Sequence, residues 1–275
     1  MAELFWDRTA EHLYETGTDH GVVYPADDNG TYPKGYAWNG ITGWTESPSG
    51  ADETALYADN IKYLSLRSAE EFGATLTAYT YPDAFAKLDG SDAPVEGMKI
   101  YQQARRSFGL SIRTLIGNDV KSNDYGYMLH LVYGLTASPS ERSYSTVNDS
   151  PEAIEFSWEL SSVPASVSGY KPTSVITIDS TKVNPAYLRN LERVLYGTTA
   201  GDVYDPTEDT TVDSEKTYYK LENGSYTAVT PEQGDNPKTN GWYEKVTLTD
   251  TDARLPLPDE VISILKGTPS NSVGG

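Results

Sequence analysis

FGLSIRTLIG (residues 108–117) and YGYMLHLVYGL (residues 125–135) are the two stretches that decide the fold class. Apolar side chains recur at every second position in both, as in a strand with one buried face. The apolar positions are Phe108, Leu110, Ile112 and Ile116 in the first stretch and Tyr127, Leu129, Leu131, Tyr133 and Leu135 in the second. We therefore expect two long strands, each with all of these side chains on one face.

The same alternation recurs in three other stretches, at residues 72–81, 154–160 and 174–179. Turn-rich segments separate them, and few long helical patterns interrupt them. Such an arrangement favours an antiparallel β-sandwich or barrel. The expected fold class is therefore mainly β.

Helix signals are few. Asn184 followed by Pro185 is a helix start signal, and Gly197 is suited to a helix C-cap. Between them, Leu188, Leu191 and Leu195 form an apolar stripe. These signals predict one amphipathic helix over 185–196 that flanks the strands. A second helix is expected from Pro258, and residues 83–88 are expected to form a single helical turn.

Residues 198–249 differ in composition from the rest, with Asp/Glu-, Thr- and Pro-rich stretches and almost no long aliphatic side chains. We expect them to be a small β-rich module inserted into a main domain of residues 1–197 and 250–275. Asn223-Gly224 between aromatic and β-branched runs predicts a hairpin. The module's aromatic side chains, which we expect to form its small core, are Tyr218, Tyr219, Tyr226, Trp242 and Tyr243.

Charge and composition exclude several classes of function. With 21 Lys and Arg against 40 Asp and Glu, the net charge of -19 argues against a protein that grips nucleic acid through a basic face. The absence of Cys excludes disulfides and thiolate metal sites, and only three widely separated His remain for a zinc site, so a metalloenzyme would need an all-oxygen site. The acidic N-terminal stretch is unlike a secretory signal, and no apolar run has the length of a membrane span, so we expect synthesis in the cytoplasm and no membrane segment.

No catalytic pattern stands out, and we expect no enzyme and no cofactor. Glu155 and Glu159 on one strand would lie about 13 Å apart, too far for a glycosidase pair. The run from Asp27 to Gly30 lacks the spaced ligands of a calcium loop, and nucleophile and phosphate-binding motifs are missing. The many Tyr and Trp leave open a carbohydrate-binding or adhesin module, against the alternative of ordinary cross-strand pairs.

Several blocks together resemble the major tail protein, or tail tube protein, of long-tailed (siphovirus-type) phages of Gram-positive bacteria. The blocks are LYETGTDHGVVYP (13–25), WNGITGWTESPSGADETALYADNIKYL (38–64), SAEEFGATLTAYTYPDAF (68–85), QQARRSFGLSIRTLIGND (102–119), YGYMLHLVYGLTASPSERSYSTVNDSPEAIEFSWEL (125–160), DSTKV (179–183) and RLPLPDEVI (254–262). Residues 198–249 resemble the small YY...Y...GWYE modules inserted in such proteins.

The resemblance implies a tail-tube-type β-sandwich flanked by a helix, with copies forming hexameric rings that stack into the tail tube of a virion. It implies as partners the chain itself and other tail proteins, such as the tape measure, tail terminator and distal tail proteins. DNA would pass without binding, because an acidic lumen repels phosphates. The inserted module is expected on the tube exterior. A tail-end or baseplate ring protein of the same fold is the alternative.

Two sets of residues follow as candidates for these roles. The polar stretch 46–60 is expected to be a ring-stacking loop, with Glu46, Asp52, Glu53, Tyr57 and Asp59 as its candidate contact residues. Glu155 and Glu159 are candidates for the lumen face, with Arg113 as a cross-strand partner of one of them, although outer solvent is an equal alternative. The N-terminal arm through Tyr24 and the tail at 269–275 have little patterning and are expected to order on assembly.

Overall fold

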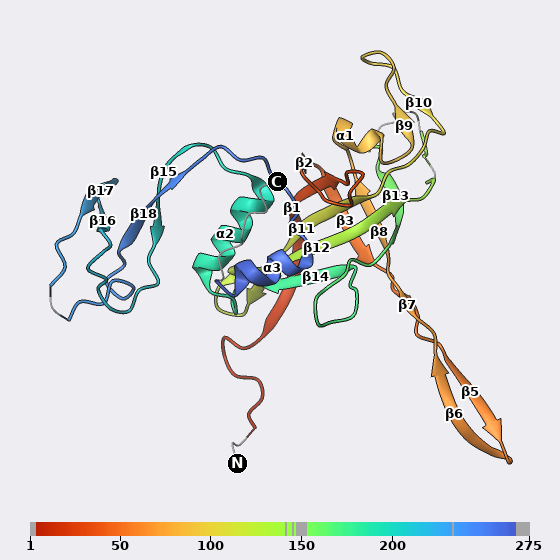
Figure 1. Cartoon of the computed structure of the whole chain (residues 1–275), viewed down its shortest axis with the longest axis horizontal. Coiled ribbons are helices and arrows are strands. Elements are labelled where there is room, and N and C mark those ends of the chain that lie inside the picture. Colours follow the sequence, from red (N-terminus) through yellow and green to blue (C-terminus); the bar gives the residue numbers. More distant parts are fainter. Residues whose placement is uncertain (1–3, 141, 145, 147–152, 233, 268–275) are drawn as a thin grey trace.

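Eight antiparallel strands form the largest sheet of the computed structural model, which describes residues 4–140, 142–144, 146, 153–232 and 234–267 (Figure 1). These strands are β1 (Leu13–Pro25), β2 (Tyr36–Trp38), β3 (Ile41–Glu46), β8 (Gly73–Ala78), β11 (Phe108–Asn118), β12 (Ser122–Ala137), β13 (Phe156–Ser162) and β14 (Val175–Asp179). Their order is β2-β1-β11-β12-β13-β8-β3, and β14 pairs with β12 as a side branch. The mainly β fold class and the five expected strands are confirmed.

The sheet branches along β12 at Gly134. Residues 128–132 of β12 pair with β14, whereas residues 135–137 pair with β13. Gly134 has φ +61°, and a Cβ there would lie 2.1 Å from the carbonyl oxygen of Val163. The register shift at this point turns Leu135 to the face opposite Leu129 and Leu131, so the expectation that all three share one face is wrong.

A first core fills the space between β1, β11 and β12 on one side and β3, β8 and β13 on the other. Trp38, Phe85 and Trp158 pack ring against ring at its centre, with centroids 4.4 to 5.4 Å apart. Phe85 comes from the short helix α1 (Asp83–Ala86), the expected helical turn. Buried aliphatic side chains complete this core, among them Val23, Leu76, Leu110, Ile112, Val132 and Leu160.

A second core lies on the other face of β1, β11, β12 and β14, under the helices α2 (Pro185–Tyr196) and α3 (Pro258–Leu265) (Figure 1). The expected leucine stripe of α2 packs here, and the Asn184 side chain accepts a hydrogen bond from the Ala186 N–H, as an N-cap does. Tyr24 is fully buried, and its hydroxyl donates to the Leu195 carbonyl at 2.9 Å. Both expected helices are confirmed.

The N-terminal segment through Tyr24 was expected to order only on assembly, but its last residues form part of β1 in the main sheet. Val22, Val23 and Tyr24 of β1 are buried in the two cores, because β1 lies between β2 and β11 within the sheet. This part of the chain is therefore ordered within one copy. The tail at 269–275 lies outside the described residues. Ile154 precedes β13 and is 38% exposed, so the fourth expected strand begins later than predicted.

A long hairpin, which we call the arm (residues 47–72), leaves the sandwich between β3 and β8 and projects away from it (Figure 1). Its strands are β4 (Ser49–Gly50), β5 (Glu53–Ala58), β6 (Ile61–Arg67) and β7 (Glu70–Glu71), paired β4 with β7 and β5 with β6. Asp59 and Asn60 at the tip both have positive φ, +53° and +62°, as a type I′ turn requires. The stretch 46–60, expected as an irregular loop, is thus the first half of a hairpin.

Residues 201–248 contain a separate four-stranded antiparallel sheet in the order β15-β18-β16-β17. Its strands are β15 (Gly201–Pro206), β16 (Tyr218–Glu222), β17 (Ser225–Ala228) and β18 (Tyr243–Leu248). Asn223 and Gly224 join β16 to β17 with φ of +51° and +80°, so the predicted hairpin is confirmed. A short pair, β9 (Ser91–Asp92) and β10 (Ile100–Tyr101), lies beyond α1.

Candidate assembly surfaces

The arm has one apolar face. Cross-strand partners point to the same side of an antiparallel pair, and the register places Leu56 opposite Leu64 and Ala58 opposite Ile61. Leu66, opposite Thr54, extends this face toward the body. The apolar side chains are open to solvent: Leu56 is 42% exposed, Ile61 64%, Leu64 38% and Leu66 55%.

The other face of the arm carries Tyr57 near the tip and, closer to the body, a group of charged residues that are hydrogen-bonded to one another. Lys62 Nζ lies 2.5 Å from Glu53 Oε1, Ser65 donates to the same oxygen, and Arg67 stands opposite Glu53. The hydrogen bond from Lys62 lowers the pKa of the Glu53 carboxyl below its usual value. Across the described part of the chain, no hydrogen bond or ion pair joins residues 53–67 to anything beyond the arm.

An isolated two-stranded hairpin is marginally stable in water, and an exposed apolar face adds to the cost of leaving it uncovered. The arm therefore has the physical character of a segment that another surface covers.

Four of the five residues predicted for stacking lie along the arm, and the fifth, Glu46, lies just before it. Glu46 ends β3, where its Oε1 accepts a hydrogen bond from Trp44 Nε1 at 3.1 Å, and Asp52 precedes β5. Glu53 and Tyr57 lie in β5, and Asp59 lies in the tip turn.

The returning strand of the arm, β6, is not predicted by the sequence analysis above. The alternation of Leu64 and Leu66, together with a turn-forming Asp59-Asn60, is the signal that could have revealed it.

A second exposed surface is the outer face of the layer formed by β3, β8 and β13. Thr45, Thr75 and Glu159 lie side by side across the three strands, and Thr77 stands beside Ser157 in the next row. The inward positions of the same strands hold Trp44, Leu76 and Trp158. This layer thus presents a hydroxyl- and carboxylate-rich face to solvent.

The two glutamates predicted for the lumen belong to this face. Glu159 is exposed in β13, and Glu155, just before that strand, accepts a hydrogen bond from the Thr42 hydroxyl. Neither carboxylate has an ion-pair partner among the described residues.

Arg113 does not pair with either glutamate, so that expectation is wrong. Arg113 instead binds Asp19 through two hydrogen bonds, Nε to Oδ1 at 2.7 Å and Nη2 to Oδ2 at 2.8 Å. This hydrogen bonding lowers the pKa of the Asp19 carboxyl. The pair lies on the side of β1 and β11 that faces Tyr196 of α2, away from the glutamates.

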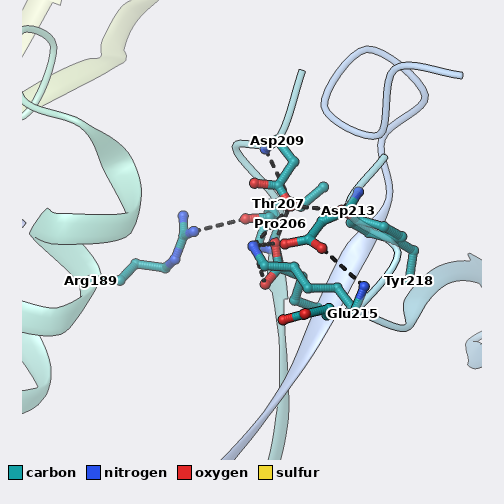
Figure 2. A network of polar contacts seen from close by, with 9 residues as sticks. Arg189, Pro206, Thr207, Asp209, Asp213, Glu215 and Tyr218 are labelled. Carbon is teal, nitrogen blue, oxygen red and sulfur yellow. Dashed lines mark hydrogen bonds and ion pairs between the residues drawn. The ribbon is translucent and has the colours of Figure 1, made fainter. Parts of the chain in front are cut away.

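The inserted sheet is tied to α2 by two arginines. Arg193 Nη2 lies 2.8 Å from Asp205 Oδ1. Arg189 Nη2 donates to the Pro206 carbonyl at 2.8 Å (Figure 2). At the base of the module, Thr198 and Thr251 form a β-bridge that brings its two ends together. The module is therefore anchored to the body at more than its two chain connections.

A polar network fills one side of the inserted sheet (Figure 2). The hydroxyl of the fully buried Tyr218 donates to Asp209 Oδ2 at 2.7 Å and accepts from the Asp213 N–H at 3.0 Å. Lys216 Nζ lies 2.9 Å from the same Asp209 oxygen, and this contact raises the pKa of Lys216. Trp242 packs on Tyr218 with ring centroids 5.7 Å apart, so these two predicted aromatics lie together in the module.

The remaining aromatics of the module gather on the opposite face of its sheet. The cross-strand register places Tyr219 beside Tyr243, and Tyr226 joins them together with Tyr204, which the sequence analysis had not singled out. The rings of Tyr204 and Tyr226 are nearly parallel, with centroids 4.1 Å apart. These four residues form what we call the tyrosine face.

Within the described ranges, no group of three or more His, Cys, Asp and Glu side chains is arranged to hold a metal ion. Among the same residues, no helix has the length and apolar character needed to span a bilayer.

No family model matches the chain, and no curated protein matches it. Among solved structures, the chain is similar to one from the sheath–tube complex of an extracellular contractile injection system (PVC) in its extended state. The identity is 15%, the TM-score is 0.27, and the match covers 58% of this chain and 88% of the other.

Proposed function

We propose that this chain is the subunit of a phage-type tail tube, in which hexameric rings stack into a conduit for the genome. The observation that carries the proposal is the arm, a hairpin that leaves the body with an exposed apolar face. Covering its Leu and Ile side chains would stabilise a contact by on the order of 1 kcal/mol for each residue. The sequence resemblance to tail tube proteins supports the same role.

A tube is favoured over a closed dimer because the arm leaves one end of the sandwich. A contact between an arm and a different surface of the next copy is heterologous, and heterologous contacts build rings or open stacks. The sandwich also keeps free strand edges, since β2 and β3 end the strand order of the main sheet. Pairing or covering such edges within a ring removes a liability of the isolated subunit.

In this assembly the hydroxyl- and carboxylate-rich face of β3, β8 and β13, with Glu155 and Glu159, lines the lumen. The asymmetry of the body supports this orientation: α2, α3 and the inserted module all lie on the side of the sandwich away from this face (Figure 1). Unpaired carboxylates repel DNA phosphates and so keep the channel wall from binding its cargo. The module then lies on the tube exterior, so deletion of residues 199–248 should leave assembly intact.

The test is imaging of purified protein and its variants by negative-stain electron microscopy, with sedimentation velocity. The wild-type chain is expected to form tubes or six-fold rings. Replacing the apolar pair with Leu56→Ser/Leu64→Ser should abolish them, whereas the control Ala55→Ser/Ser65→Ala, a cross-strand pair on the charged face, should not. Circular dichroism melting checks that both variants fold. A wild-type chain that stays monomeric at high concentration and in native tails contradicts the proposal.

The tyrosine face supports a second candidate function for the module, binding of a neutral glycan. Aromatic side chains at a solvent-accessible face supply large apolar contact area with polar tips, and Tyr226 is 36% exposed. The module, residues 198–249, has 10 acidic and 4 basic residues, and this charge disfavours the binding of acidic polymers. A glycan array probed with the full chain tests this: any signal should vanish in Tyr226→Ala and persist in Tyr170→Ala, a 77% exposed tyrosine of the body.

A further inference from the structure

A cleft of about 640 Å³ lies at the end of the body opposite the arm. It is formed by Asp89 after α1, by Tyr101 at the end of β10 with Arg105 in the following loop, and by Arg142 and Tyr144 after β12. Figure 1 shows α1, β9 and β10 at one end of the molecule and the arm leaving from the other. This cleft plays no part in the surfaces described above.

The cleft is cationic in a protein that is otherwise strongly acidic. Arg142 is neutralised by an ion pair with the buried Asp89 and lies over the ring of Tyr101, with Cζ 5.2 Å from the centroid. Arg105 has no ion-pair partner among the described residues and packs against Gly90. Tyr101 is 52% exposed and Tyr144 71%. The charge of Arg105 also acts on Asp89, so two guanidinium groups share one carboxylate. The cleft therefore keeps a net positive charge beside two exposed aromatic rings.

The tip of the arm has the complementary character. Asp59 has no ion-pair partner in the described part of the chain, because the nearby Lys62 binds Glu53. Ile61, which follows the tip turn, is 64% exposed, and Tyr57, two residues before Asp59, is 72% exposed. The carboxylate at the arm tip has the opposite charge to the guanidinium in the cleft. The apolar side chains beside it can pack on the aromatic rings that line the cleft.

The topology places the two features head to tail. Strand β8 begins at Gly73, where the arm returns to the body, and ends at Ala78, after which the chain forms α1 and reaches Asp89 in the cleft. Moving one copy along the direction of β8 carries its arm toward the cleft end of a neighbour. A contact of this kind can repeat without limit.

We propose that the arm tip of one copy docks in this cleft of the next copy, with the Asp59 carboxylate against the Arg105 guanidinium. This inference rests on the proposed function, and it assigns the surface that receives the arm. Burial of the tip beside Tyr101 and Tyr144 strengthens the charge pair by excluding water.

A double-mutant cycle tests the pair through the critical concentration for tube assembly, measured by pelleting. Asp59→Asn, which keeps a residue that tolerates positive φ, and Arg105→Gln should each raise the critical concentration about tenfold. The double variant should raise it no further than either single variant. Arg106→Gln is the matched control, since Arg106 is the neighbouring exposed arginine outside the cleft, and it should stay within about twofold of wild type.

Disulfide trapping gives an independent readout, because the natural chain has no Cys. Asp59→Cys combined with Gln103→Cys, a cleft residue, should give a ladder of covalent oligomers on a non-reducing gel after oxidation. Asp59→Cys combined with Lys238→Cys in the inserted module should not.

The outcomes separate the two proposals. Wild-type tubes with additive single effects, or with no ladder from the cleft pair, overturn the docking site alone. Failure of the wild-type chain to form tubes or rings overturns the tube function, and the docking site with it.

Discussion

Arg193 on α2 and Asp205 on β15 form an ion pair, Nη2 to Oδ1 at 2.8 Å, that joins the inserted module to the body. The side chains are 21% and 18% exposed, so water screens the pair only in part. Arg189 adds a hydrogen bond to the next residue, Pro206. The orientation of the module thus depends on a helix that belongs to the body's second core.

Arg193→Gln should loosen the module without unfolding the body. Because the pair is partly exposed, we expect a loss of about 1 kcal/mol or less, confined to β15 and β18. Hydrogen–deuterium exchange should show faster exchange of these strands and unchanged exchange of α2. Lys238→Gln, which breaks the Lys238–Glu208 pair inside the module, is the control that leaves the connection to α2 intact.

Tyr218→Phe should destabilise the module by about 1–2 kcal/mol, because it removes a buried hydroxyl that serves both Asp209 and the Asp213 N–H. Tyr219→Phe removes a hydroxyl on the opposite face and should change stability little. The measurement is proteolysis of the module under native conditions. Equal susceptibility of the two variants would contradict the role assigned to the Tyr218 network.

Gly134→Ala should destabilise the body by several kcal/mol. The residue has positive φ, and the added Cβ would meet the Val163 backbone oxygen at 2.1 Å. Gly169→Ala shares the positive φ, +79°, but meets no atom within 4 Å, so it should lose only about 1 kcal/mol. Urea denaturation of both variants separates the steric effect from the conformational one.

His130 should make stability depend on pH near neutrality. Its ring lies half-buried, with Nε2 3.0 Å from the Thr114 hydroxyl and no partner for Nδ1 among the described residues. Burial lowers its pKa, although the charges of Glu46 and Glu15 oppose this. The unfolded chain therefore binds the proton more tightly, and the free energy of unfolding should fall as the pH drops below about 6.5.

The measurement for His130 is urea unfolding between pH of about 7.5 and about 5. His130→Gln should flatten the dependence. An unchanged or steeper slope in His130→Gln would contradict the assignment.

Local patterns predicted most of the regular structure. The alternation at 108–116 and the capped leucine stripe at 185–196 have a physical basis within the stretch itself, so β11 and α2 could be located from sequence. The face of the sheet on which Leu135 lies could not be predicted from the sequence. The bulge at Gly134 that decides it depends on a contact with Val163, which lies on another part of the chain. A single register shift reverses the faces that follow it.

The arm and the Arg113–Asp19 pair also could not be predicted from local sequence patterns. Strand β5 has apolar residues on both faces, with Ala55 and Tyr57 on one side and Leu56 and Ala58 on the other, so its period-two signal is weak. The partner of Arg113 lies 94 residues away at Asp19, on a strand that the sequence analysis did not predict. Pairing between distant residues is set by topology, which local patterns do not report.

The arm leaves only one end of the sandwich, and this gives a stack of such subunits a direction. One terminus presents free arms and the other presents bodies without arms, so the two termini are chemically different substrates for any protein that binds them. A factor that starts the stack cannot also stop it through the same surface. In the proposed tube, initiation and length control would therefore require two separate recognition events, each at a different part of this chain.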